Sequence, residues 1–334
     1  PEGIRMTTLA ANSLNVAITG ASGYIGSALV ESLERHGCKT LSVSSKGITS
    51  KTGNRTLRAN IRLLDCWMEI VQFADVIYHL AGNTSVYAAA SDPAESLNST
   101  VLPITQLLKA ATMLRRKPRV ILASTATVYG LPALIPVDEH TEPNPITVYD
   151  THKFFAERQL DFASDQGILE GVSLRLSNVY GPSARICGAT DRGILNQITA
   201  KALRGEDIDV FGDGNYLRDY IYIDDVIKSF IAAGMSIGSP TGVFNVGSSK
   251  GVAIHEAFGI VRKQVKALTG KHVGISYVTW PEEADLIDRR NYAAGIDKIN
   301  EAFGWSPTVS LEDGVALLVE SMLKSDYPAG SNYG

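Results

Sequence analysis

An apolar strand that leads through a glycine-rich loop into a helix lies near the beginning of this chain. Residues 15–19 are apolar and β-branched and end at Gly20, which predicts a buried strand. The loop reads Gly20-Ala21-Ser22-Gly23-Tyr24-Ile25-Gly26. In such a loop the first glycine permits a tight turn, the next lets the backbone approach a pyrophosphate, and the last allows close packing of helix on strand. A strand, this loop and a helix predict a dinucleotide site in an α/β domain.

Strands and helices alternate through the first half of the chain. Apolar runs predict further strands at 39–43, 75–80, 119–123 and 171–176, and helical patterns lie at 28–35, 100–114 and 149–163. Strands that alternate with helices form a mostly parallel sheet covered on both faces. We therefore expect an α/β fold with a Rossmann-type doubly wound parallel sheet.

The pattern changes after Asn178. Glycine and proline become frequent and the elements shorten, with a late strand at 221–223, which predicts a smaller mixed α/β lobe at the C-terminal side. We expect this lobe to cap the sheet. The expected boundaries are 14–177 and about 216–246 for the dinucleotide-binding domain, 178–215 and 247–326 for the lobe, and 1–13 and 327–334 for tails.

The composition excludes several kinds of partner. The net charge is −4 without a basic block, so nucleic acid is not expected. No apolar run is long enough to span a membrane, and residues 1–15 lack the apolar core of a secretory signal. We expect a cytoplasmic protein whose natural start is Met6. The cysteines, Cys38, Cys66 and Cys187, lie far apart, so we expect neither disulfides nor a metal site.

The end of the second predicted strand bears on the choice of dinucleotide. About 20 residues after the glycine loop, a site for NAD usually has an Asp or Glu that binds the ribose hydroxyls. Here the stretch is Val43-Ser44-Ser45-Lys46, without a carboxylate. Hydroxyls and a cation favour the 2′-phosphate of NADP. We expect NAD or NADP, with NADP favoured; the alternative is that Ser44 alone serves NAD and Lys46 is a solvated surface charge.

A tyrosine and a lysine lie four residues apart at the start of a predicted helix. The stretch is Tyr149-Asp150-Thr151-His152-Lys153, and residues four apart share a helix face. A tyrosine phenol ordinarily has a pKa of about 10, and a neighbouring cation lowers it by roughly 1–3 units. Such a pair is suited to moving a proton on or off a hydroxyl while a hydride moves elsewhere. Most isolated pairs of this kind lie on solvated helix faces, so the surrounding motifs decide whether this pair is catalytic.

Further stretches follow in an order that resembles a known family over residues 14–325. They are His79-Leu80-Ala81-Gly82, then 123–130, 175–182, 211–214, 218–226 and 303–307. With the glycine loop and the Tyr149/Lys153 pair, the chain resembles the extended short-chain dehydrogenases/reductases. More narrowly, it looks like the nucleotide-sugar epimerase/dehydratase branch, and is closest in motif to UDP-sugar 4-epimerases. We interpret 303–307 as a packing segment.

The resemblance implies that the C-terminal lobe binds the nucleotide-sugar, and it also implies roles for individual residues. Tyr149 is the expected acid/base, Lys153 lowers its pKa and holds the cofactor ribose, and Thr125 hydrogen-bonds the same sugar oxygen. The expected substrate-binding residues are Thr84, Ser124, Thr125, Asn178 and Arg218, of which Asn178 and Arg218 contact the diphosphate. The expected cofactor-binding residues are Gly20, Gly23, Tyr24, Ile25, Gly26, Ser44, Ser45, Lys46, Asn60, Ile61, Leu80, Ala81, Gly82, Thr100, Tyr149 and Lys153.

Three polar residues near these motifs are expected to have structural roles. We expect His79 to satisfy a buried hydrogen bond, Asp219 to orient Arg218 or cap a turn, and Tyr129 to pack.

Departures from the family pattern narrow the reaction. The 4,6-dehydratases of this family have an Asp-Glu pair directly after the catalytic Thr, where this chain has Ala126 and Thr127, so dehydration is not expected. The resemblance instead implies an NAD(P)-dependent epimerase that oxidises and re-reduces a nucleotide-diphosphate sugar at C4 through a keto intermediate. The arginine that grips the diphosphate in many epimerases is absent near Ala284 and Asp285, although Arg289 and Arg290 follow.

Two alternatives stay open. One is an NADPH-dependent reductase of a 4-keto-6-deoxy nucleotide-sugar, and the other is a non-catalytic regulator that senses the cofactor. In the family, helices at about 100–116 and 149–165 often pair across a two-fold axis in a four-helix bundle, so we expect a homodimer. Burial within one chain is the alternative explanation for the apolar residues of the second helix, Phe154, Phe155, Leu160 and Phe162.

Overall fold

The computed structural model describes residues 14–47, 54–182, 193–238 and 240–324. Its centre is a seven-stranded sheet in the order β11-β6-β5-β4-β1-β2-β3, in which every neighbouring pair is parallel. The strands are β1 (Asn15–Thr19), β2 (Lys39–Ser44), β3 (Arg55–Arg58), β4 (Val76–His79), β5 (Arg119–Thr125), β6 (Glu170–Leu176) and β11 (Gly242–Val246).

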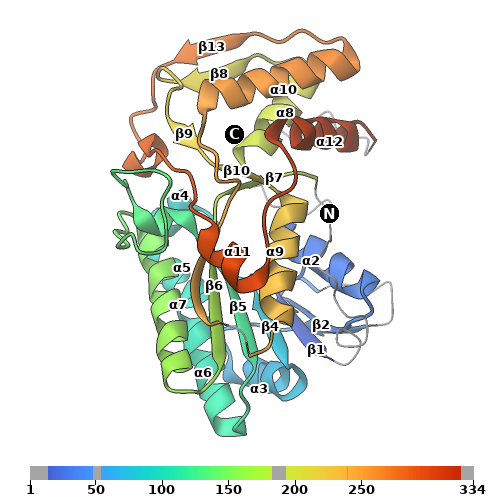
Figure 1. Cartoon of the computed structure of the whole chain (residues 1–334), viewed down its shortest axis with the longest axis vertical. Coiled ribbons are helices and arrows are strands. Elements are labelled where there is room, and N and C mark those ends of the chain that lie inside the picture. Colours follow the sequence, from blue (N-terminus) through green and yellow to red (C-terminus); the bar gives the residue numbers. More distant parts are fainter. Residues whose placement is uncertain (1–13, 48–53, 183–192, 239, 325–334) are drawn as a thin grey trace.

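Helices cover both faces of this sheet (Figure 1). Because side chains alternate along a strand, Val16 and Ile18 of β1 face α2 (Tyr24–Arg35) and α9 (Ile223–Met235) in one core. Ala17 faces the other way, into a second core. That core contains side chains of α3 (Leu64–Phe73), α6 (Leu102–Leu114) and α7 (Val148–Asp165). The predicted Rossmann-type doubly wound α/β fold is confirmed.

The structure adds elements that the sequence patterns did not predict. The strand β3 is short, polar and largely exposed at the sheet edge, so no apolar run marks it. The predicted helix 100–114 is confirmed as α6, but α5 (Pro93–Thr100), which meets it at Val101, was not predicted. Pro103 explains the break, because it lacks the N–H that would continue the hydrogen bonding of α5. The short helix α4 (Val86–Ser91) precedes them.

A smaller mixed α/β lobe lies at one end of the sheet (Figure 1). It contains the parallel pair β8 (Ile208–Phe211) and β13 (Ile275–Val278). The remaining short pairs are β7 (Asn178–Tyr180) with β10 (Tyr220–Tyr222), and β9 (Leu217–Arg218) with β12 (Val252–Ala253). Its helices are α8 (Ile194–Arg204), α10 (Ile254–Thr269) and α12 (Leu311–Lys324). The exact domain boundaries stay a prediction.

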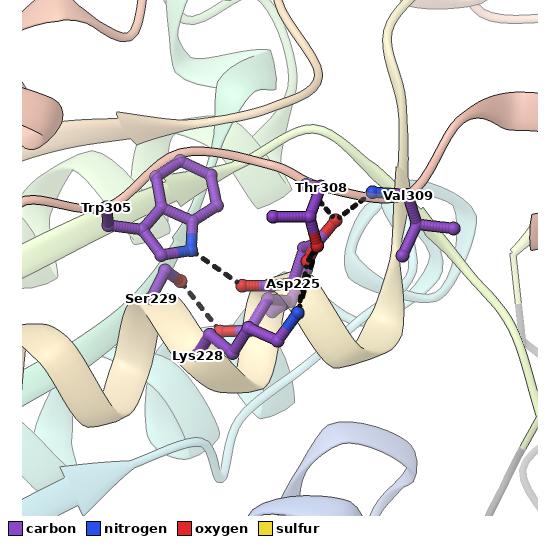
Figure 2. A network of polar contacts seen from close by, with 7 residues as sticks. Asp225, Lys228, Ser229, Trp305, Thr308 and Val309 are labelled. Carbon is purple, nitrogen blue, oxygen red and sulfur yellow. Dashed lines mark hydrogen bonds and ion pairs between the residues drawn. The ribbon is translucent and has the colours of Figure 1, made fainter. Parts of the chain in front are cut away.

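A buried carboxylate on α9 anchors the segment that leads to α12 (Figure 2). Asp225 accepts hydrogen bonds from the backbone N–H groups of Thr308 and Val309, at 2.7 and 2.9 Å. The indole Nε1 of Trp305 donates to the Asp225 backbone carbonyl at 3.0 Å. Trp305 is 1% exposed, so the interpretation of 303–307 as a packing segment is confirmed. This segment follows α11 (Asp297–Phe303).

Three predicted absences can be examined for the described residues only. Among them, no helix combines the length and the apolar content that crossing a bilayer needs. Cys38 and Cys66 are buried free thiols, whereas Cys187 lies outside the described residues. Within the same ranges, no three His, Cys, Asp or Glu side chains come together in a way that could hold a metal ion.

Candidate functional site

The glycine loop joins β1 to α2 as a tight turn. Gly20 has a φ of +71°, a conformation that side chains other than glycine rarely adopt, and its carbonyl accepts the Gly23 N–H at 2.8 Å. A Cβ on Gly26 would overlap the carbonyl oxygen of Gly20, so only glycine permits this approach of helix and strand. The loop thus leaves a backbone cradle at the N-terminus of α2, which fits a pyrophosphate.

A cavity of about 580 Å³ opens beside this loop, where β1, β2, β3 and β4 end. Ligands of open α/β sheets bind at this edge, outside the carboxyl ends of the strands. The lining residues are Gly20, Ser22, Val43, Ser44, Ser45, Arg58, Ala59, Asn60, Ile61, Arg62, Ala81, Gly82 and Ser99. Seven of the residues expected from the sequence are in this set: Gly20, Ser44, Ser45, Asn60, Ile61, Ala81 and Gly82.

Cations but no carboxylates line this cavity among the residues that the structure describes. Arg58 at the end of β3 donates from Nε to the carbonyl of Ser45 at 3.3 Å, and Arg62 forms an ion pair with Glu95. Neither arginine was predicted from the sequence, because no apolar pattern marks the strand β3 that brings Arg58 there. Lys46 is absent from the lining, although its backbone N–H donates to Ser44 Oγ at 3.2 Å.

Other residues expected at the cofactor lie around the cavity rather than in its lining. The Tyr24 hydroxyl donates to the carbonyl of Gly181 at 2.7 Å, which joins α2 to the segment after β7. Thr100 Oγ1 accepts the Asn83 N–H at 3.4 Å. Ile25 and Leu80 pack against the hydrophobic core. Contact of these four residues with a cofactor stays a prediction.

Tyr149 and Lys153 share one face of α7, as predicted. The Lys153 Nζ lies 5.9 Å from the centre of the Tyr149 ring and donates to the carbonyl of Ala123 on β5 at 3.0 Å. It also lies 3.7 Å from the point where a Cβ on Gly82 would stand, and Gly82 lines the cavity. Burial lowers the pKa of Lys153 to about 8, against the opposing charge of Glu157.

Thr125 and Ser124 face opposite sides of β5. The Thr125 hydroxyl lies 2.8 Å from the Thr127 hydroxyl at the start of the short 3₁₀ helix η1 (Ala126–Tyr129). The Ser124 hydroxyl instead donates to Glu157, inside a buried ion pair in which Arg175 approaches Glu157 to 2.7 Å. Ser124 is thus engaged in the interior, which does not favour the expected contact with substrate. The alternation of side chains along a strand already predicts this difference.

Two buried arginines lie together in the smaller lobe. Arg218 and Arg290 are 6% and 9% exposed, and neither forms an ion pair with a carboxylate among the described residues. Burial, together with the charge of Arg290, lowers the pKa of Arg218 to about 10. Arg290 follows the short 3₁₀ helix η2 (Leu286–Arg289) and donates to the Asn178 side chain at 3.4 Å. The predicted pair Asn178 and Arg218 therefore gains a second guanidinium.

The three residues expected to be structural are confirmed in that role. His79 Nδ1 lies 2.7 Å from the Thr19 hydroxyl, and burial lowers the pKa of this imidazole to about 3. Asp219 accepts the N–H groups of Ser248 and Ala294 at 2.7 and 2.9 Å, so it caps loops. The buried Tyr129 hydroxyl donates to Asn245 at 2.9 Å. Thr84, expected at the substrate, is exposed between β4 and α4.

Known proteins resemble this chain over nearly its whole length. It is 29% identical to a UDP-glucose 4-epimerase of Mycolicibacterium smegmatis, over 92% of this chain and 98% of that protein. The crystal structure of the Thermotoga maritima UDP-glucose 4-epimerase with UDP-glucose superposes with a TM-score of 0.82 at 30% identity, over 93% and 99% of the two chains. The Thermus thermophilus UDP-glucose 4-epimerase with NAD gives a TM-score of 0.81 at 26% identity, over 93% and 100%.

A family model covers the part of the chain that contains the proposed chemistry. The model of the NAD dependent epimerase/dehydratase family matches residues 16–247. This span includes the glycine loop, Thr125 and the Tyr149/Lys153 pair. The chain therefore belongs to the NAD-dependent epimerase/dehydratase family.

Proposed function

We propose that this protein is an NAD(P)-dependent enzyme that inverts C4 of a nucleotide-diphosphate sugar. The observation that carries the proposal is the position of Lys153. Its ammonium lies beside the Tyr149 ring and next to Gly82, which lines the cavity between the strand ends. Lys153 thus lies between the proposed proton-transfer group and the cavity at the strand ends. The relatives that bind UDP-glucose and NAD support the same assignment.

The dinucleotide would lie in the cavity, with its pyrophosphate at the glycine loop. When bound, it accepts a hydride from the sugar and returns it. Tyr149 removes the proton of the C4 hydroxyl and later gives it back, and Lys153 stabilises the phenolate by its charge. Thr125 hydrogen-bonds the same sugar oxygen. Return of the hydride to the opposite face requires that the keto-sugar turn over within the site.

The diphosphate of the sugar nucleotide would lie between Arg218, Arg290 and Asn178. Within the described ranges these two buried guanidinium groups have no carboxylate in an ion pair, which is unfavourable, and an anion between them relieves this cost. Arginine is well suited to phosphate because its donors form a planar fork. In this assignment Arg290 binds the diphosphate in place of the arginine that many epimerases have at the position near Asp285.

An aromatic cluster in the lobe would receive the nucleobase. The rings of Phe211 and Trp280 are stacked with centroids 5.4 Å apart, and the Tyr216 ring meets Trp280 edge-on at 6.0 Å. Phe211 is 40% exposed. A flat, partly exposed ring of this kind offers a stacking surface that a planar base can cover.

A homodimer through α6 and α7 is part of the same proposal. Phe155 and Phe162 of α7 are 49% and 60% exposed, and Met113 of α6 is 58% exposed. Leu160 is buried and Phe154 packs against the chain's own core, so burial within one chain accounts for those two. Sedimentation of the double variant Phe155→Glu/Phe162→Glu tests the dimer: we expect a monomer, and an unchanged mass would contradict it.

Arg58 favours a second candidate, an NADPH-dependent reductase of a 4-keto-6-deoxy nucleotide-sugar. A guanidinium and two serines at the ends of β3 and β2, with no carboxylate among the described lining residues, suit the 2′-phosphate of NADP. NADP as the preferred dinucleotide is compatible with either reaction. A non-catalytic regulator is disfavoured, because Tyr149, Lys153 and Thr125 are all present.

One experiment separates these candidates. The purified protein is incubated with UDP-glucose and catalytic NAD or NADP, and UDP-galactose is measured by chromatography. Epimerisation without net change in the reduced cofactor supports the proposal. If a 4-keto-6-deoxy nucleotide-sugar instead drives stoichiometric NADPH oxidation while UDP-glucose, UDP-glucuronic acid and UDP-N-acetylglucosamine are unchanged, the reductase is the correct assignment. Mass spectrometry of any co-purifying nucleotide gives an independent identification of the cofactor.

A further inference from the structure

Asp150 is a fully buried carboxyl group next to the proposed acid/base. It follows Tyr149 in the first turn of α7 and is 0% exposed. Its backbone N–H donates to Thr147 Oγ1 at 3.1 Å. Neither carboxyl oxygen has a hydrogen bond of ordinary geometry within the described residues. Burial of a carboxyl group without such hydrogen bonds is unfavourable, and Asp150 has no role in the proposed mechanism.

The groups that face Asp150 come from three other segments. The hydroxyls of Thr127 in η1 and of Thr147 before α7 lie near enough to favour the charged form. The positive charge of Arg290 also favours it, whereas the negative charge of Asp285 opposes it. Burial is the largest effect, and the pKa of Asp150 is raised. The neutral carboxyl is therefore accessible nearer to neutral pH than for an exposed Asp.

Thr127 connects this carboxyl group to Thr125. The Thr127 N–H donates to Thr125 Oγ1 at 3.2 Å, and the two hydroxyl oxygens lie 2.8 Å apart. A hydroxyl has one proton to donate and two lone pairs. One lone pair of Thr125 is already used by the Thr127 N–H. The hydrogen bond between the two hydroxyls then has two possible directions. If Thr125 donates it, Thr125 keeps one free lone pair, and if Thr127 donates it, Thr125 keeps a free proton.

We propose that Asp150 is a positioning residue that sets the direction of the Thr127–Thr125 hydrogen bond. A charged Asp150 attracts the Thr127 proton, so Thr125 must donate to Thr127 and offers only a lone pair outward. A neutral Asp150 donates to Thr127, which then donates to Thr125, and the Thr125 proton points outward. A keto oxygen can only accept, so the neutral form is the one that assists its formation. This step rests on the proposed function, which places a sugar oxygen beside Thr125.

The activity test compares pH profiles of kcat and KM for the wild type, Asp150→Asn, Thr127→Val and Thr127→Ser. The wild type should lose kcat about tenfold per pH unit above the pKa of the carboxyl group, as a single required proton dictates. The side-chain NH2 of Asp150→Asn is a donor at every pH, so this variant should lack the falling limb. It should keep only the loss of kcat that follows deprotonation of Lys153. Thr127→Val should lose the limb and Thr127→Ser should keep it. A limb that persists in both Asp150→Asn and Thr127→Val overturns the proposal.

A spectroscopic test does not depend on turnover. Infrared titration should give the carbonyl band of a protonated carboxyl group that is missing in Asp150→Asn. The band should be shifted in Thr127→Val, which lacks the hydroxyl that the proposal places against this carboxyl group. Thr147→Val removes the other hydroxyl that favours the charged form of Asp150 but is not connected to Thr125, so it should move the falling limb of kcat to higher pH without abolishing it. A band that does not respond to Thr127→Val overturns the coupling. A wild type with this coupling but no C4 chemistry counts against the proposed function instead.

Discussion

The Nζ of Lys153 lies 5.9 Å from the centre of the Tyr149 ring while it donates to the carbonyl of Ala123 at 3.0 Å. The strand end thus fixes the lysine, and the lysine in turn faces the phenol. Lys153 is also buried, so its charge acts on Tyr149 with little screening by solvent. This arrangement makes the two residues separable by experiment.

Replacement of Tyr149 by Phe should remove proton transfer and leave the fold intact. The phenylalanine ring keeps the packing of Tyr149 but has no hydroxyl, and general acid–base catalysis typically contributes about 10²–10⁴-fold in rate. We expect kcat of the C4 reaction to fall by about that factor, while the Kd for the dinucleotide, measured by fluorescence titration, stays within about twofold. Tyr277→Phe, at an exposed position in the lobe, is the control. Wild-type turnover by Tyr149→Phe would refute the acid/base assignment.

Lys153 should make stability rise with pH in a defined window. Its pKa is about 8 in the folded protein against 10.5 for an ordinary lysine. Between these values the unfolded chain binds more protons, so the free energy of unfolding increases with pH, by up to about 1.4 kcal/mol per pH unit for one group. Urea denaturation of the wild type and of Lys153→Met between pH 7 and about 11 measures the difference. Parallel curves for the two proteins would contradict the burial of this charge.

The sheet could be predicted from the sequence because its inner strands are apolar runs, while its edges could not. The strand β3 is polar, and without it Arg58 has no predicted place at the cavity. The opposite edge strand, β11, pairs with β6 after a separation of more than sixty residues, a contact that no local pattern encodes. Such pairings depend on the packing of the whole domain.

The site was predictable where its residues are close in sequence, and less so elsewhere. Tyr149 and Lys153 follow from helix periodicity. Arg290 reaches Asn178 only because η2 turns the chain at Leu286–Arg289. Its distance in sequence from the position where the family has its arginine does not reveal this turn. Asp150 lies one position from Tyr149, but its burial depends on η1 and Arg290, which lie far away in sequence.

Arg58 should determine the preference between NADP and NAD. Loss of its guanidinium removes a charge-assisted contact to a 2′-phosphate, which is worth about 1.5–3 kcal/mol, but little from NAD. We expect Arg58→Ala to weaken NADP binding by about 10- to 100-fold relative to NAD in calorimetric titrations. Arg55→Ala is the matched control, since Arg55 lies on the same strand, pairs with Glu69 and does not line the cavity. An equal loss in Kd for both dinucleotides would show that Arg58 does not read the phosphate.

Removal of one partner of the Glu157–Arg175 ion pair should lower the free energy of unfolding strongly, and replacement of both by apolar residues should lower it much less. Both side chains are buried, and Arg175 approaches Glu157 to 2.7 Å. Glu157→Gln leaves the Arg175 charge without its counter-ion, and such changes cost about 3–5 kcal/mol. A double replacement by apolar residues, Glu157→Leu/Arg175→Met, should recover much of this loss. Chemical denaturation measures both, with the exposed pair partner Glu69→Gln as a control expected within about 1 kcal/mol. A double variant less stable than Glu157→Gln would contradict the expectation.

Asp225 should link the attachment of the 305–309 segment to acid pH. Burial opposes ionisation of this carboxyl group, but the hydrogen bonds from Lys228, Thr308 and Val309 outweigh it and hold the pKa of Asp225 below its ordinary value of 3.8. Asp225→Ala leaves the two backbone donors of Thr308 and Val309 unpaired, and each such group costs about 1–3 kcal/mol. We therefore expect a clear loss of unfolding free energy at neutral pH.

The pH dependence of this loss distinguishes charge from packing. Below about pH 4 an unfolded Asp binds a proton before the folded one does, so the contribution of Asp225 is complete above this pH and declines as the pH falls through the lowered pKa. The stability difference between the wild type and Asp225→Asn should accordingly be largest near pH 7 and shrink in acid, as measured by denaturation at each pH. Asp313→Asn, at an exposed carboxyl group in the first turn of α12, should give a small difference throughout. A stability difference between the wild type and Asp225→Asn that stayed constant down to pH 3 would contradict this expectation. It would mean that protonation leaves the hydrogen bonds of Asp225 as strong as before.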